Sequence, residues 1–266
     1  MKSTLLSGAA VATALAASAF SASGALAQDT GWYGAIDLGG HHQRGLESQF
    51  VSGAGGGAFT GTEGFNFRVR DIDYAGFARI GYRLTPNFRI EVEGGYRHGS
   101  LQSVTDFADQ TGDVDLCATG STAESCGKPD GNVNAWTGMV NALIDILPAA
   151  RLDPFIGGGA GANHVKVRAD GDLVGTGVVG SAHGNVDDSS TKFAYQGIAG
   201  VAFRASERLN VDLTYRYLSG SKINFLAVDQ TDGVSGVLSG RYRDQSLTLG
   251  LRYSFASPPP PPPPPP

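Results

Sequence analysis

The sequence predicts an all-β fold: an eight-stranded antiparallel transmembrane β-barrel with four long external loops and short periplasmic turns. The segment FRIEVEGGYR, residues 88–97, alternates between apolar and charged side chains, and successive side chains of a strand face opposite sides of a sheet. Similar alternation recurs in eight segments, joined by connections that are alternately short and long. This combination is typical of barrels with lipid outside and a polar interior.

The N-terminal residues 1–27 have the pattern of a secretory signal peptide. Lys2 gives a positive start, an apolar stretch rich in Ala and Ser follows, and Ala25-Leu26-Ala27 forms a small-x-small cleavage site. The alternative is a membrane anchor, but the stretch is short, and no other run reaches the ~20 apolar residues of a spanning helix. We therefore expect export of the mature chain, with a barrel domain over residues 28–257.

Residues 258–266 are an unbroken proline run. Polyproline rises about 3.1 Å per residue, so this run is expected to form a semi-rigid linker of roughly 28 Å. The net charge of −5 is modest and argues against nucleic acid as a partner.

The eight predicted strands are spaced along the whole mature chain. In order they are residues 31–40, 71–84, 88–97, 132–146, 154–167, 192–204, 211–217 and 246–255. The connections at 85–87, 147–153 and 206–210 are short, and those at 44–67, 99–131, 170–190 and 228–241 are long and polar. Short turns at one end and long loops at the other are the rule for outer-membrane barrels.

The first four strands each set an apolar face against a charged or amide face. Their apolar faces carry Trp32, Ile36 and Leu38, then Ile72, Tyr74, Ile80, Tyr82 and Leu84, then Phe88, Ile90, Val92 and Tyr96, and then Trp136, Val140, Ala142, Ile144 and Ile146. This period of two is what a strand with one face in lipid requires.

The last four strands repeat the pattern, although glycines weaken it in residues 154–167, where Val165 and Val167 oppose His164, Lys166 and Arg168. The remaining apolar faces carry Phe193, Tyr195, Ala199, Val201 and Phe203, then Val211, Leu213, Tyr215 and Tyr217, and then Leu247, Leu249, Leu251, Tyr253 and Phe255.

Aromatic residues near the strand ends fit the girdles of a membrane barrel. They are Trp32, Tyr82, Phe88, Tyr96, Trp136, Phe155, Phe193, Phe203, Tyr217, Tyr253 and Phe255. The alternative is a soluble, lipocalin-like barrel with its charged face outside, which would rarely need eight strands of ten or more residues.

Five segments carry a resemblance to the OmpA-type outer-membrane β-barrel proteins of Gram-negative bacteria, in their alphaproteobacterial form. They are GWYGAIDLGG, GYRLTPNFRIEVEGGYR, DPFIGGGAG, YQGIAGVAFRASERLNVDLTYRYL and LTLGLRYSF, and the proline run resembles the hinge of that family. Family members usually continue into a peptidoglycan-binding domain. None follows here, so we do not extend cell-wall tethering to this chain.

The resemblance implies the outer membrane as location, with its lipid, its lipopolysaccharide and the outer-membrane assembly machinery as partners. It implies that the machinery reads Tyr253 and Phe255 in the last strand. It also implies a role in envelope integrity, with slow or gated diffusion of small solutes as a further possibility. The alternative function is a surface adhesin or receptor module that acts through the long external loops.

The inward faces bring charged residues into a narrow lumen, where unpaired charges are costly. We therefore predict a lumenal salt-bridge network, formed by Asp37, Arg79, Arg89, Glu91, Glu93, Asp145, Asp212, Arg216 and Arg252. Such a network acts either as a purely structural ionic core or as a gate.

Cys117 and Cys126 are the two cysteines of an exported chain, which favours a disulfide. Metal binding would need more ligands nearby, and we expect neither a metal nor a cofactor. Ser100, His98 and Glu93 superficially resemble a catalytic group, but nothing in the sequence shows them converging on an oxyanion site. We therefore expect no enzymatic activity.

Overall fold

The structure is a computed structural model, and it describes residues 30–44, 46–52, 62–106, 114–122, 125–175, 182–229 and 235–255. The predicted signal peptide and proline linker lie outside these residues. Within the described residues, no helix is long and apolar enough to cross a membrane.

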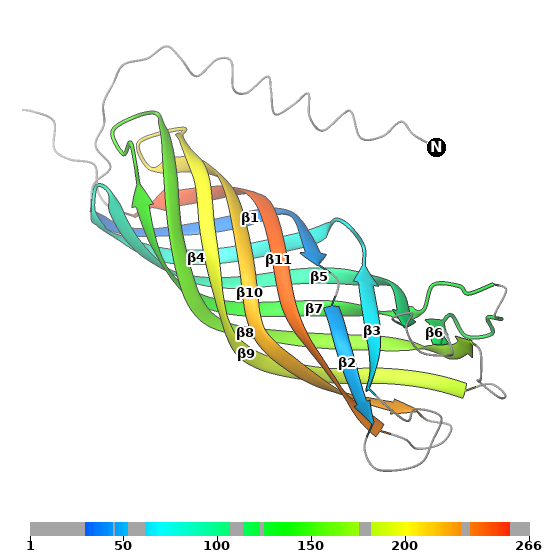
Figure 1. Cartoon of the computed structure of the whole chain (residues 1–266). Coiled ribbons are helices and arrows are strands. Elements are labelled where there is room, and N and C mark those ends of the chain that lie inside the picture. The colour runs from blue at the N-terminus through cyan, green and yellow to red at the C-terminus, as the bar shows by residue number, and fades with distance from the viewer. Residues whose placement is uncertain are drawn as a thin grey trace, which may run out of the picture.

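The described chain forms eleven strands, which Figure 1 shows as one elongated barrel. They are β1 (Gly31–Arg44), β2 (Leu46–Ser52), β3 (Thr62–Val69), β4 (Asp73–Thr85), β5 (Phe88–Asp106), β6 (Val114–Cys117), β7 (Asp130–Asp145), β8 (Leu152–Gly175), β9 (Ala182–Arg204), β10 (Leu209–Asp229) and β11 (Ser235–Ser254). Eight of them close an antiparallel ring in the order β1-β4-β5-β7-β8-β9-β10-β11, and β11 pairs back to β1. The predicted fold class is confirmed.

A second ring of strands continues the wall beyond the ends of β1, β4 and β7. There β2 and β3 fill the space between β11 and β5, and β6 lies between β5 and β8. The upper wall therefore has the order β2-β3-β5-β6-β8-β9-β10-β11. In Figure 1, β2, β3 and β6 lie at the lower right, at the end of the barrel opposite the short turns. We call this end the upper section of the barrel, and the end with the short turns the lower part.

Three of the segments expected as long loops, 44–67, 170–190 and 228–241, are mostly strand, which corrects the prediction for them, and residues 99–131 contain the end of β5, all of β6 and the start of β7. β8 alone has 24 residues. At about 3.3 Å per residue it is far longer than a spanning strand of 9–11 residues requires.

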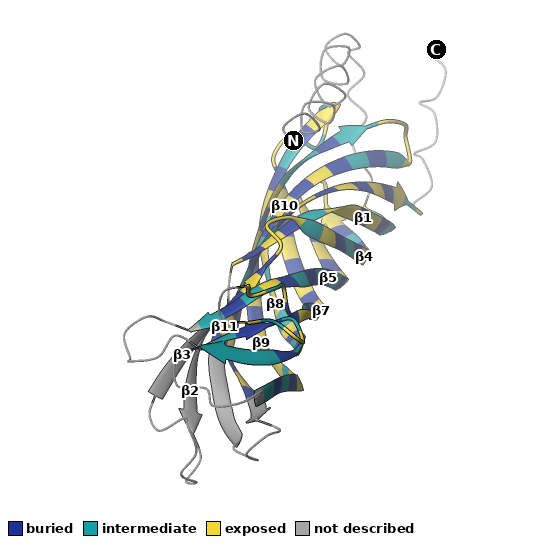
Figure 2. Ribbon diagram, turned by 90° about the vertical axis from the view of Figure 1, so that its right-hand side faces the viewer, coloured by how far each residue is buried: buried dark blue, intermediate teal, exposed yellow. Residues whose placement is uncertain are grey.

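The lower part of the barrel alternates as predicted, with an apolar outer surface and a polar interior, and Figure 2 shows this as bands of exposed and buried residues. On the outer surface, Trp136, Val140, Ile144 and Ile146 are all at least half exposed. From Trp136 to Ile146 the chain rises about 33 Å, or about 25 Å along the axis at a tilt of about 40°. This height matches the apolar band of an outer-membrane barrel.

Above this band the polarity of the two faces is reversed. On β8, Val165 and Val167 are buried inside, whereas Lys166 and Arg168 face outward. The interior is filled by one apolar cluster, which we call the apolar plug. Its buried members are Phe67, Val69, Leu101, Val104, Leu116, Val133, Ala135, Met139, Val165, Val167, Ala169, Val186, Ala194, Leu218, Ile223, Phe225 and Tyr242. The upper section is thus built like a soluble barrel.

One aromatic prediction is wrong. Phe155 was assigned to the outer girdle, but it is 1% exposed and points inward. The glycines that follow it on β8 hide the period of the strand, and the Arg89 guanidinium lies over its ring at 4.7 Å. Phe155 is therefore part of the lumen filling.

Candidate functional site

The centre of the lumen is occupied by a buried carboxylate that joins two arginines. Asp37 Oδ1 accepts from Arg79 Nη2 at 2.8 Å, and Asp37 Oδ2 accepts from Arg216 Nη2 at 2.6 Å. Arg216 also donates from Nε to Glu93 Oε2 at 2.9 Å and from Nη1 to the Thr248 hydroxyl at 2.8 Å. β5 and β10 stand opposite each other in the ring, so the Arg216–Glu93 pair spans the lumen.

A second carboxylate, Asp212, ties the neighbouring walls together. Its Oδ2 atom lies 3.2 Å from Arg79 Nη2 and 3.1 Å from Arg252 Nε. Both arginine side chains are almost fully buried. Asp212 thereby links β10 to β4 and β11 at the same level of the lumen.

Towards the short turns the network continues through Glu91 and Asp145. Glu91 Oε1 accepts from Arg79, from Arg89 at 3.0 Å and from the Tyr33 hydroxyl at 2.7 Å. Asp145 lies 3.1 Å from Arg89 and 2.8 Å from Arg83. Charged groups thus fill this end of the lumen.

The structure brings all nine predicted network residues together and adds a tenth, Arg83. The acids are Asp37, Glu91, Glu93, Asp145 and Asp212, and the bases are Arg79, Arg83, Arg89, Arg216 and Arg252. Five acids therefore meet five bases. The predicted set had one base too few, and charge balance in a dry lumen would have pointed to Arg83, which lies on the same inward face as Arg79.

A further charged group that sequence reasoning missed lies one level higher. Asp244 accepts from His41 Nδ1 at 2.6 Å and lies 2.9 Å from Arg97 Nε. Phe77 separates this level from the network, since Arg97 lies over its ring at 4.8 Å and Arg216 at 4.2 Å. Above Asp244 begins the apolar plug.

The disulfide prediction is confirmed, because Cys117 and Cys126 are bonded. The loop that they close is held on β8 by Asp172, whose carboxylate accepts from the Gly120 amide at 2.7 Å and from His183 Nδ1 at 3.0 Å. Gly120 has a φ of 84°, which favours glycine. This loop belongs to the upper section.

His183 is held between two carboxylates of β8. The hydrogen bond to Asp172 raises the pKa of its imidazole, and a hydrogen bond to Asp170 acts in the same direction. Conversely, His183 lowers the pKa of Asp172. The protonated histidine is therefore the form that this part of the barrel favours.

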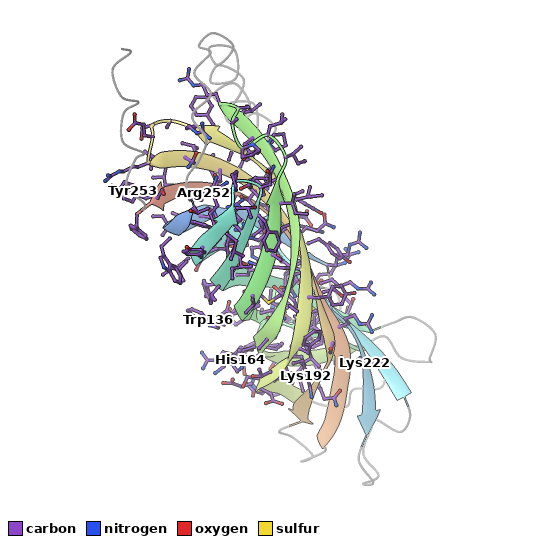
Figure 3. The ribbon with its side chains drawn as sticks, turned by 90° about the vertical axis from the view of Figure 1, so that its left-hand side faces the viewer. Trp136, His164, Lys192, Lys222, Arg252 and Tyr253 are labelled. Carbon is purple, nitrogen blue, oxygen red and sulfur yellow. A yellow bond between two sulfur atoms is a disulfide. The ribbon has the colours of Figure 1, made fainter. Side chains whose placement is uncertain are left out.

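Tyr253 and Phe255 face outward at the end of β11, with ring centroids 5.8 Å apart. Figure 3 shows Tyr253 and Arg252 at one end of the barrel and Trp136 well away from them. Their role as an assembly signal stays a prediction.

The three residues that resemble a catalytic group do not converge. Ser100 Oγ donates to Asp73 at 2.8 Å and lies 3.5 Å from His98 Nε2. Glu93 is held elsewhere, by Arg216 and by Gln196 at 2.9 Å.

Comparison with known proteins shows similarity to outer-membrane β-barrel proteins. A family model described as outer membrane protein beta-barrel domain matches residues 9–255. An uncharacterized protein of Brucella abortus is 26% identical over 192 residues, which are 66% of this chain and 66% of that protein. The outer membrane protein PagN of Salmonella typhimurium is 25% identical over 189 residues, 68% of this chain and 73% of PagN.

Among solved structures, the outer membrane protein OprG of Pseudomonas aeruginosa matches with a TM-score of 0.52 at 11% identity. The match covers 86% of this chain and 99% of OprG. At this identity the likeness concerns the fold.

Proposed function

This chain belongs to the outer membrane protein beta-barrel domain family, and from that premise we propose a non-enzymatic barrel with a closed lumen that contributes to envelope integrity. Its location is the bacterial outer membrane. The observation that carries the proposal is the filling of the lumen at two successive levels, first by the charged network and then by the apolar plug.

The two levels are obstacles of different kinds to the slow or gated diffusion expected from the sequence. A solute would have to separate buried ion pairs such as Arg216–Glu93, at a cost of several kcal/mol. It would then have to displace close-packed side chains such as Leu218 and Phe225. We therefore propose that the network is a structural ionic core and that the resting barrel does not conduct.

Conductance in planar bilayers tests this proposal. Wild type should be silent. Arg216→Ala should also be silent, because the apolar plug remains. The double variant Leu218→Ala with Phe225→Ala should be silent as well, because the network remains. Only the triple variant should conduct. Leu249→Ala, on the outer face, serves as the control, and stepwise conductance of wild type would refute the closed lumen.

The absence of catalysis is part of the same proposal. The engagement of Glu93 inside the lumen supports it, because Glu93 is not placed to orient His98. Turnover of a fluorogenic ester, phospholipid or peptide by wild type that is lost in His98→Ala would overturn it.

A second candidate function, surface attachment, is favoured by the extension above the membrane. There β2, β3 and β6 each pair with a neighbouring strand on both sides and so complete the wall. Such a wall can present side chains rigidly to a host, phage or matrix partner. Deletion of residues 46–69 that abolishes binding to cells while the barrel stays folded would support this function, and unchanged binding would count against it.

The finer likeness to OmpA-type barrels is also a proposal, supported by the ionic lumen and by the five sequence segments described above. It implies that the assembly machinery reads the last strand.

A further inference from the structure

Four basic side chains face outward on three neighbouring strands. Arg44 of β1 lies directly opposite Arg243 of β11, and Lys222 of β10 lies directly opposite Arg241 of β11. Arg241 and Arg243 are two residues apart and share one face, because Tyr242 between them is fully buried inside the barrel. We call these four residues the basic cluster.

The arrangement is unfavourable by itself. Like charges directly opposite each other on one face of an antiparallel pair are destabilising. Among the side chains that the structure describes, which do not include those of residues 45–66, no carboxylate forms an ion pair with any of the four. By contrast, Lys166 and Arg168 on the outer face of β8 share the carboxylate of Asp187, each at 3.2 Å.

The height of the basic cluster identifies the anion it meets. The outward residues Leu38 of β1 and Leu247 of β11 belong to the lipid-facing band, at 71% and 55% exposure. Arg243 is four residues beyond Leu247, about 13 Å along the strand and about 10 Å higher along the axis. In Figure 3, Lys222 lies farther along the barrel from Tyr253 than Trp136 does.

We propose that the basic cluster binds the phosphate groups of a phosphorylated lipid in the outer leaflet. Headgroups are the anions nearest to this level of the barrel wall, whereas a soluble partner would meet the tip first. Guanidinium groups pair with phosphate oxygens in a bidentate manner, and two opposed arginines can share one phosphate. The lipid phosphates thus supply counter-charge to these four cations.

The inference depends on the outer-membrane location and not on the closed lumen. Lipid binding and conductance can therefore fail separately. It assigns a site to a partner class, phosphorylated lipid, through four named side chains.

The test compares lipid retention by native mass spectrometry of the refolded full barrel. The probes are lipid A with both phosphates and the same lipid after dephosphorylation. The variant is Arg241→Gln with Arg243→Gln, and the matched control is Lys166→Gln with Arg168→Gln, which removes the same charge from the outer surface. Heat-modifiable gel migration checks that every variant is folded.

Wild type should retain the phosphorylated lipid in preference to the dephosphorylated one. Loss of two surface cations should weaken retention roughly 30-fold, and the control should change it less than about threefold. Equal retention by wild type and the cluster variant would overturn the proposal, as would equal retention of both lipids. Preferential binding of a soluble sulfated polysaccharide to the same four residues would also overturn it and would indicate a soluble partner instead.

Discussion

Arg216 on β10 reaches across the barrel to Glu93 on β5, with 2.9 Å between Nε and Oε2. The two strands are four positions apart in a ring of eight, so this pair joins opposite walls. Both side chains are almost fully buried, and Arg216 also binds Asp37. The pair therefore couples the two halves of the wall.

Removal of one partner should be more harmful than removal of both. Arg216→Ala leaves Asp37 and Glu93 with an uncompensated buried charge and should lower the free energy of unfolding by about 3–5 kcal/mol. Adding Glu93→Gln should recover part of this loss. Urea unfolding in lipid vesicles measures both, and additive losses in the double variant would contradict the coupling.

Two glycines, Gly161 on β8 and Gly138 on β7, offer a matched test of close strand packing. A methyl group at Gly161 would overlap the backbone oxygen of Gly138 on β7, whereas a methyl group at Gly138 would meet nothing within 4 Å. We expect Gly161→Ala to destabilise the barrel by about 1–3 kcal/mol and Gly138→Ala to be near neutral. Equal urea midpoints for the two variants would show that β7 and β8 can move apart freely.

The upper section of the barrel should be sensitive to pH through His183. Its raised pKa means that the stabilisation is complete below the unfolded value of about 6.5 and is lost as pH rises through the higher folded value. Hydrogen-exchange protection of the Gly120 amide, corrected for intrinsic rates, should fall as the pH rises above about 6.5. In His183→Gln the protection should be independent of pH, and an unchanged profile in that variant would assign the effect to another group.

The end of β11 separates assembly from stability. Phe255 is 58% exposed and Leu251 50% exposed on the protein surface, so both face the membrane, and Phe255→Ala and Leu251→Ala should each lower the unfolding free energy by a similar amount, about 1–2 kcal/mol. If the assembly machinery reads this residue, the amount of heat-modifiable barrel in cells should fall severalfold, while refolding of the pure protein is unaffected. Leu251→Ala on the same outer face is the control, and equal yields from the two variants would argue against a terminal signal.

The membrane-spanning half of the fold was predictable because lipid enforces a strict period of two. Residues 88–97 show this, since Ile90 and Val92 face outward and Glu91 and Glu93 face inward as expected. The upper half was not predictable in the same way. The period on β8 sets Val165 and Val167 against Lys166, but it does not say which face is inside.

Local irregularity hid other parts of the extension. On β10 the register shifts between Ser219 and Lys222, so the inward positions change from Leu218 to Ile223 and the period is broken. The network was predictable from charge on inward faces. Its partners across the lumen, such as Gln196 with Glu93, depend on barrel closure and cannot be derived from local pattern.

The reversal of polarity along the strands also fixes the depth of the barrel. If the barrel sank, the basic cluster and the Lys166 region would approach the hydrocarbon, and the cost for each cation would rise with depth from about 0–1 kcal/mol near the interface towards about 2–4 kcal/mol at the midplane. If it rose, Leu247 and its lipid-facing neighbours would meet water. The barrel therefore has one resting depth, and a bilayer of different thickness must deform to match it.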